Sequence, residues 1–146
     1  MDSLVCLVPP CLDGAFTTFD LMRMGVSVFH AILFLQSGID KIVDRAGNVS
    51  WLTGHFAKSP LARMVVPMLS VLTLVEVVAG ALSAVGGILL LVNGSRVLAA
   101  LGALLSMLAL LMLFFGQRMA KDYGGAAGLV PYFLVAVLSL GLMGVP

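Results

Sequence analysis

Four long apolar segments dominate this chain, and each is long enough to cross a lipid bilayer as a helix. They cover residues 21–39, 62–92, 97–115 and 128–145. A helix that spans the hydrocarbon core needs about 20 mostly apolar residues, because each residue adds about 1.5 Å. Charged side chains make up only 10% of the chain, against about 25% in a typical soluble domain. The sequence therefore predicts an all-α fold, an integral membrane bundle of four transmembrane helices that forms a single domain over residues 1–146.

Three polar connections join the predicted helices. The first covers residues 41–59 and contains His55, which we expect in a solvated loop. The second is a tight break at residues 93–95. The third is expected to turn at Gly124 and Gly125, because glycine adopts the backbone angles that tight turns need.

Lysine and arginine residues are distributed unequally between the two sides of the predicted bundle. Arg23 and Arg96 fall on one side. The other six fall on the opposite side: Lys41, Arg45, Lys58, Arg63, Arg118 and Lys121. The positive-inside rule makes the side with six cytoplasmic, so both termini are expected to face outward. The net charge of +1 gives no basic surface of the kind that nucleic acid requires, so no nucleic-acid partner is expected.

Polar side chains inside the predicted spans mark a candidate site, because such groups are costly in lipid and commonly functional. Arg23, His30 and Lys41 share one face of the first helix, and Glu76 lies on the second beside small residues. Counted from the helix midpoints, His30 and Glu76 both fall near mid-membrane, so we expect an antiparallel helix pair to bring them together. Such a pair would handle protons or anchor a quinone-like headgroup. The alternative is a structural clasp between helices.

Two cysteines near the N-terminus form a second candidate feature. Cys6 and Cys11 flank two prolines in the segment that we expect outside the membrane. An oxidising compartment would permit a disulfide between them, and the alternative is two unpaired thiols. Neither their spacing nor the two separated histidines match a zinc or haem site, so no metal is expected.

Two polar motifs resemble those of DoxX-like membrane proteins. The first helix carries Arg23 near its start and ends in SGIDK at residues 37–41, and the family's first helix commonly ends in Ser/Ala-Gly-x-x-Lys. EVVAG at residues 76–80 is similar to the family's second-helix glutamate followed by small residues. The resemblance implies a four-helix bundle in a prokaryotic cytoplasmic membrane, with a site at Arg23, Lys41 and Glu76. Some members are thiosulfate:quinone oxidoreductase subunits, and others accompany redox complexes.

Three functions of different classes follow from these expectations. The first is a small membrane subunit of a respiratory or quinone-linked redox complex, which uses its polar seam to bind a quinone or partner helices. The second is a small membrane oxidoreductase acting on quinone or sulfur compounds, for which Cys6 and Cys11 offer the only electron path. The third is a proton- or solute-conducting protein that uses His30 and Glu76. The expected partners are membrane lipid and either other membrane subunits or further copies of this chain, and the one expected ligand is a quinone.

Overall fold

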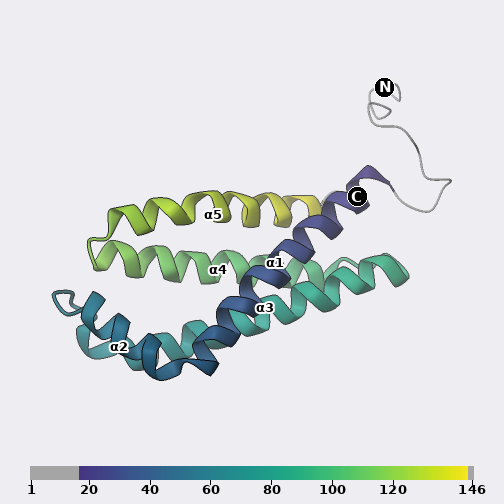
Figure 1. Ribbon diagram of the computed structural model, residues 1–146. Helices are drawn as coiled ribbons and strands as arrows, with labels where there is room; N and C mark the ends of the chain where they lie inside the picture. The colour runs from purple at the N-terminus through teal and green to yellow at the C-terminus, as the bar shows by residue number, and fades with distance from the viewer. Residues whose placement is uncertain (1–16, 145–146) are drawn as a thin grey trace.

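The computed structural model describes residues 17–144, and this part of the chain is built from helices (Figure 1). The elements are α1 (Thr18–Val43), α2 (Arg45–His55), the short 3-10 helix η1 (Ala62–Met64), α3 (Val65–Asn93), α4 (Val97–Met119) and α5 (Tyr123–Gly144). Within these residues, four segments are long and apolar enough to cross a membrane, namely α1, η1 with α3, α4 and α5. The predicted all-α bundle of four transmembrane helices is confirmed, and the chain is a multi-pass membrane protein.

Side-chain caps fix where the first two helices begin. Asp20 accepts a hydrogen bond from the Thr17 backbone N–H (3.0 Å), and the Thr17 hydroxyl accepts one from the Asp20 backbone N–H (3.2 Å). This reciprocal capping box satisfies backbone donors that the first turn of a helix leaves open. Asp44 caps the N-terminus of α2 by accepting a hydrogen bond from the Gly47 N–H at 3.1 Å. The two helices are therefore separated by a single capping residue.

Two of the predicted connections differ from the structure. Residues 45–55 form the helix α2, where the sequence predicted a polar loop. The segment RAGNVSWLTGH contains two glycines and an asparagine, which are typical of loops, so its composition predicted a connection. The last turn lies at Lys121 and Asp122, while Gly124 and Gly125 belong to α5. Asp122 begins that helix by accepting a hydrogen bond from the Gly125 N–H at 2.8 Å.

The helix α1 runs diagonally across the other three long helices (Figure 1) and packs mainly on α3, while α4 lies between α3 and α5. Glycines allow the closest approaches. A Cβ on Gly80 would lie 2.7 Å from the Leu35 backbone nitrogen, and one on Gly38 would lie 2.6 Å from a Val77 methyl. Small residues commonly let transmembrane helices approach in this way. These contacts set the position of α1 along α3.

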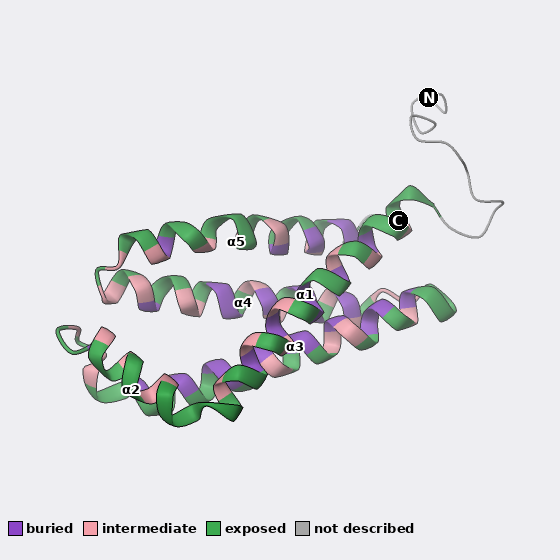
Figure 2. Cartoon of the chain, in the orientation of Figure 1, coloured by how far each residue is buried: buried purple, intermediate pink, exposed green. Residues whose placement is uncertain are grey.

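The surface of the bundle is apolar, as expected for helices in contact with lipid. Buried positions lie where helices face one another, and exposed positions lie along their outer sides (Figure 2). Ile32, Leu74 and Leu134 each have more than 60% of their surface exposed, although such side chains are usually buried in soluble proteins. The buried polar side chains are instead inside the bundle: Arg23, Ser27, His30, Thr73, Glu76, Ser83, Ser106 and Ser139.

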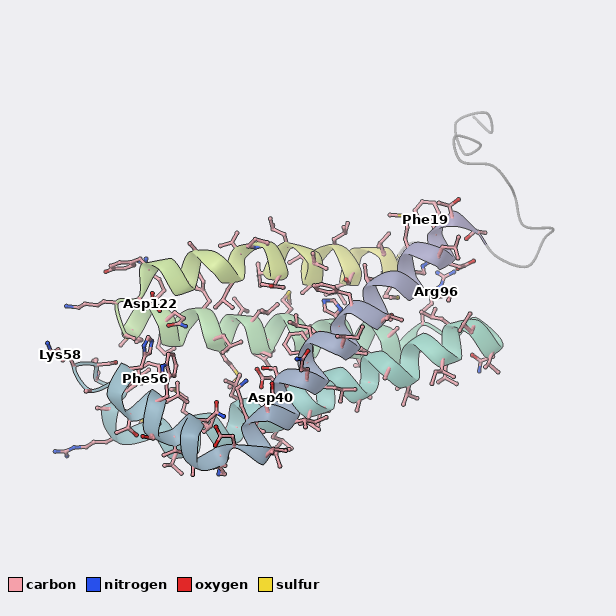
Figure 3. The ribbon with its side chains drawn as sticks, in the orientation of Figure 1. Phe19, Asp40, Phe56, Lys58, Arg96 and Asp122 are labelled. Carbon is pink, nitrogen blue, oxygen red and sulfur yellow. The ribbon has the colours of Figure 1, made fainter. Side chains whose placement is uncertain are left out.

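The two ends of the bundle differ in charge. Phe56, Lys58 and Asp122 lie at one end and Phe19 and Arg96 at the other (Figure 3). We call the first the basic end, because the chain also places Arg63, Arg118 and Lys121 at the helix termini there. The other is called the opposite end. Both ends of the described chain, at residues 17 and 144, belong to the opposite end, since the number of spans between them is even.

Candidate functional site

The carboxylate of Glu76 is fully buried in the bundle and is held by two residues of α1. The Lys41 ammonium Nζ lies 2.9 Å from Glu76 Oε2 and 3.2 Å from Oε1. The Ser37 hydroxyl donates a hydrogen bond to Oε1 at 3.2 Å and accepts one from Lys41 Nζ at 2.6 Å. The three side chains form a closed polar cluster, which we call the Glu76 cluster.

The sequence of α1 explains how the cluster assembles. Ser37 and Lys41 are four residues apart, so they project from the same face of the helix in successive turns. Gly38 lies between them and lets α3 approach at Val77, the neighbour of Glu76. Isolated charges inside a bilayer are expensive, and pairing with an opposite charge reduces that cost. The Lys41 side chain keeps 15% of its surface exposed, so its ammonium group is only partly desolvated.

A cavity of about 210 Å³ lies against this cluster. Ser37 and Glu76 form part of its wall, and Tyr132 of α5, with 40% of its surface exposed, forms another part. The cavity is partly open to the outside of the bundle. The remaining lining is apolar: Leu33, Phe34, Leu110, Leu113 and Leu129. The cavity therefore connects the polar side chains of Ser37 and Glu76 with the apolar outer surface of the bundle.

The predicted pair of His30 and Glu76 is not formed. Glu76 is in the bundle interior, as expected, but its partners come from the turn of α1 that holds Ser37 and Lys41. His30 lies seven residues before Ser37, about 10 Å along the helix axis. The prediction was wrong because it aligned the midpoints of the two helices, whereas the contacts of Gly38 with Val77 and of Gly80 with Leu35 set a different register.

His30 and Arg23, the other two predicted site residues, lie outside the Glu76 cluster. His30 is 1% exposed and packs between the rings of Phe29 and Phe34, with centroid distances of 5.8 and 6.1 Å. Arg23 is 2% exposed and donates from Nε to the Leu142 carbonyl of α5 at 2.9 Å. Its guanidinium also pairs with Asp20 at 2.9 Å. Arg23 thus ties α1 to α5 at the opposite end.

A second polar contact at the basic end was missed by the sequence analysis. His55 Nε2 lies 2.9 Å from Gln117 Oε1, so α2 is joined to the end of α4. The His55 ring stacks on Trp51, with centroids 4.7 Å apart, and Phe56 packs against Gly116 with only 3% of its surface exposed. His55 is therefore half-buried in a helix-helix contact and is not a solvated loop residue. The residue types gave no signal, because the contact depends on where α2 folds back.

Cys6 and Cys11 lie outside the described residues, so the expected disulfide stays a prediction. Within residues 17–144, no group of three His, Cys, Asp or Glu side chains is placed to hold a metal ion. Comparison with protein-family models, curated proteins and solved structures found no match. The candidate site therefore rests on the geometry of the Glu76 cluster and its cavity.

Proposed function

We propose that this multi-pass membrane protein binds the headgroup of a lipophilic, quinone-like compound in the cavity beside the Glu76 cluster, and that it serves as a small membrane subunit of a respiratory or redox complex. The observation that carries the ligand proposal is that Ser37 and Glu76, two members of the buried Glu76 cluster, stand in the wall of a mostly apolar cavity. The resemblance of residues 37–41 and 76–80 to DoxX-like proteins supports the redox context.

The chemistry of the cavity wall suits a ring with carbonyl oxygens. Ser37 lines the cavity and has one O–H donor, which a ligand carbonyl can compete for with Glu76, while Lys41 holds Ser37 and Glu76 in place from outside the cavity lining. The Tyr132 side chain lines the same cavity and brings a further hydroxyl. Ligand sites typically combine an apolar lining with a few placed polar groups. The Glu76 carboxylate adds a group that can exchange a proton with a bound ring.

The size and opening of the cavity favour a headgroup over a whole lipid. A volume of about 210 Å³ is below the usual range of about 300–1,000 Å³ for sites that enclose a drug-sized ligand. A single substituted ring fits this space better than a complete molecule. The partial opening then leaves an isoprenoid tail in the surrounding lipid, which needs no dedicated binding pocket.

Binding can be tested with decylubiquinone and the purified protein in lipid nanodiscs. The variant Leu129→Trp places a large side chain in the cavity without changing the charged cluster. Its control is Leu138→Trp on the same helix, where the side chain is 55% exposed and faces lipid. We expect Leu129→Trp to weaken binding by about tenfold or more, equivalent to about 1.4 kcal/mol, and Leu138→Trp to bind like the wild type.

A charge variant tests the polar half of the same site. Lys41→Met removes the cation that positions Ser37 and Glu76 in the cavity wall, so it should also weaken decylubiquinone binding by about tenfold. Cooperative thermal unfolding of every variant checks that the fold is retained. Wild-type protein that does not bind decylubiquinone, or a folded Leu129→Trp protein that binds it as tightly as the wild type, would overturn the proposed ligand site.

A further inference from the structure

Apart from Glu76 Oε2, which is ion-paired with Lys41, four buried polar side-chain atoms have no hydrogen-bond partner within residues 17–144. They are Ser27 Oγ, His30 Nε2, Ser83 Oγ and Ser106 Oγ. Each of these side chains is 2% exposed or less. An unsatisfied buried polar group is destabilising, so four together are unfavourable in a dry interior.

Other hydroxyls in these helices show that a partner is ordinarily within reach. Ser70, Thr73 and Ser139 each donate to the backbone carbonyl four residues earlier, at 2.7 to 2.8 Å. This local bond is the usual solution for a hydroxyl in a helix. Ser83 and Ser106 lie in the same kind of helix but do not make this bond, and the Ser83 hydroxyl lies against Gly102 of α4.

Glycine contacts place the three serines in a connected line from α1 to α4. A Cβ on Gly87 would lie 3.4 Å from Ser27 Cβ, so Ser27 faces α3 one turn from Ser83. A Cβ on Gly102 would lie 2.8 Å from the Ser83 backbone nitrogen, so Ser83 faces α4 one turn from Ser106. His30 is three residues from Ser27 on α1, so the two side chains lie on the same side of that helix, less than one turn apart.

The line continues to Glu76. With Ser83 opposite Gly102 in the antiparallel pair of α3 and α4, Ala79 lies opposite Ser106, and Glu76 is one turn beyond Ala79. One helical turn rises about 5.4 Å. Two hydrogen bonds of about 2.8 Å that meet at the tetrahedral angle of one water span roughly 4.6 Å. Because the side chains also project from their helices, one or two waters have the reach to connect polar groups one turn apart.

We propose that Ser27, His30, Ser83 and Ser106 bind a file of internal water molecules that joins the opposite end of the bundle to the Glu76 carboxylate. Buried waters typically satisfy polar groups that lack protein partners. The file begins one turn from Arg23, which is itself fixed by Asp20 and by the Leu142 carbonyl. It gives Glu76 a route for proton exchange along the contacts of α1, α3 and α4. This water site is independent of whether the cavity binds a quinone.

The sequence makes the water site measurable because His30 and His55 are its only histidines. Protein labelled with ¹⁵N-histidine can be reconstituted into liposomes, and magnetisation transfer from water to each imidazole ring can be followed by solid-state NMR. His55→Gln assigns the two signals. We expect the His30 ring to receive magnetisation from water in the wild type, and about threefold more slowly or not at all in the double variant Ser83→Ala/Ser106→Ala.

The matched control is Ser139→Ala, since that buried hydroxyl is already satisfied by the Val135 carbonyl. It should leave the His30 signal unchanged. Absence of transfer to His30 in the folded wild-type protein, or equal transfer in the wild type and the double variant, would overturn the proposed water site.

The link to Glu76 needs a second measurement, because the ligand cavity also brings water near this group. Glu76 is the only glutamate in the sequence, so ¹³C-glutamate labelling reports on this carboxylate alone. In Leu129→Trp, which fills the cavity, transfer from water to Glu76 should persist. Adding Ser106→Ala should then reduce it about threefold or more. Equal transfer with and without Ser106→Ala would show that the file does not reach Glu76.

Discussion

At the scale of single residues, the cost of charge in a membrane identifies the site, and helix register decides its composition. Glu76 is recognisable in the sequence because it places a charge within an apolar span, and Lys41 because it shares a face of the first helix with Arg23 and His30. Their pairing is not recognisable, because it depends on which turns of α1 and α3 meet. His30 looked like the better partner from its depth alone. Because Glu76 is already held by Ser37 and Lys41, His30 is not its partner.

The Glu76 cluster predicts an asymmetry between its two charges. Lys41→Met leaves a carboxylate that is completely buried without its cation, whereas Glu76→Gln leaves an ammonium that already reaches 15% exposure. Loss of one partner of a buried pair costs about 3–5 kcal/mol, and the partial exposure of Lys41 places the expected loss for Lys41→Met near the lower value. Glu76→Gln should lose less than half as much. Equilibrium unfolding in mixed detergent micelles measures both.

The double variant Lys41→Met/Glu76→Gln completes this cycle. It should recover most of the stability lost in Lys41→Met, because no uncompensated charge remains buried. Additive losses in the double variant, or a Lys41→Met protein as stable as the wild type, would contradict the view that Lys41 neutralises Glu76.

At the scale of elements, the bundle is organised by close contacts at glycines. The sequence showed small residues after Glu76, and it predicted correctly that this face of α3 meets another helix. It did not show which residue each glycine faces, because that depends on the crossing of α1 over α3. The position of α2 could not be predicted for the same reason, because it depends on the contacts of His55 and Phe56 with the end of α4.

Adding a methyl group at the crossing should therefore destabilise the bundle. Gly80→Ala introduces a Cβ 2.7 Å from the Leu35 backbone nitrogen, so one helix must move. Overpacking of this kind costs about 1–3 kcal/mol. Gly25→Ala on α1 is the control, since its Cβ would meet no atom of the described chain within 4 Å. Equal unfolding free energies for the two variants would show that the glycine contact does not set the packing of α1 on α3.

At the scale of the whole molecule, the apolar composition predicted the class of fold, and the long apolar runs predicted its four spans. Those features need no knowledge of tertiary contacts, because length and hydropathy alone decide whether a helix can cross a bilayer. The first predicted helix, at 21–39, was too short, since the cap at Thr17 and the extension to Val43 use residues that are less apolar than the centre. The cavity could not be predicted, because its lining comes from α1, α3, α4 and α5, whose arrangement the sequence does not show.

The distribution of basic residues predicts how the molecule is oriented. The basic end should face the cytoplasm, so a reporter fused after Lys58 should be cytoplasmic and one fused after Pro146 should be outside. Each position is fused both to alkaline phosphatase, which is active outside the cytoplasm, and to a fluorescent protein, which is active inside it. The two reporters at one position therefore control each other. Cytoplasmic reporter activity at Pro146 would reverse the orientation.

The central claim is that Glu76 is an ionised carboxylate, held by Lys41, whose environment changes when a ring occupies the adjacent cavity. Isotope-edited infrared spectroscopy of ¹³C-glutamate protein in nanodiscs tests it most directly, because the label reports on Glu76 alone. We predict a carboxylate band in the free protein that shifts when decylubiquinone is added, and no shift in Leu129→Trp. A protonated carboxyl band in the free protein, or an unchanged carboxylate band at saturating decylubiquinone, would contradict this account.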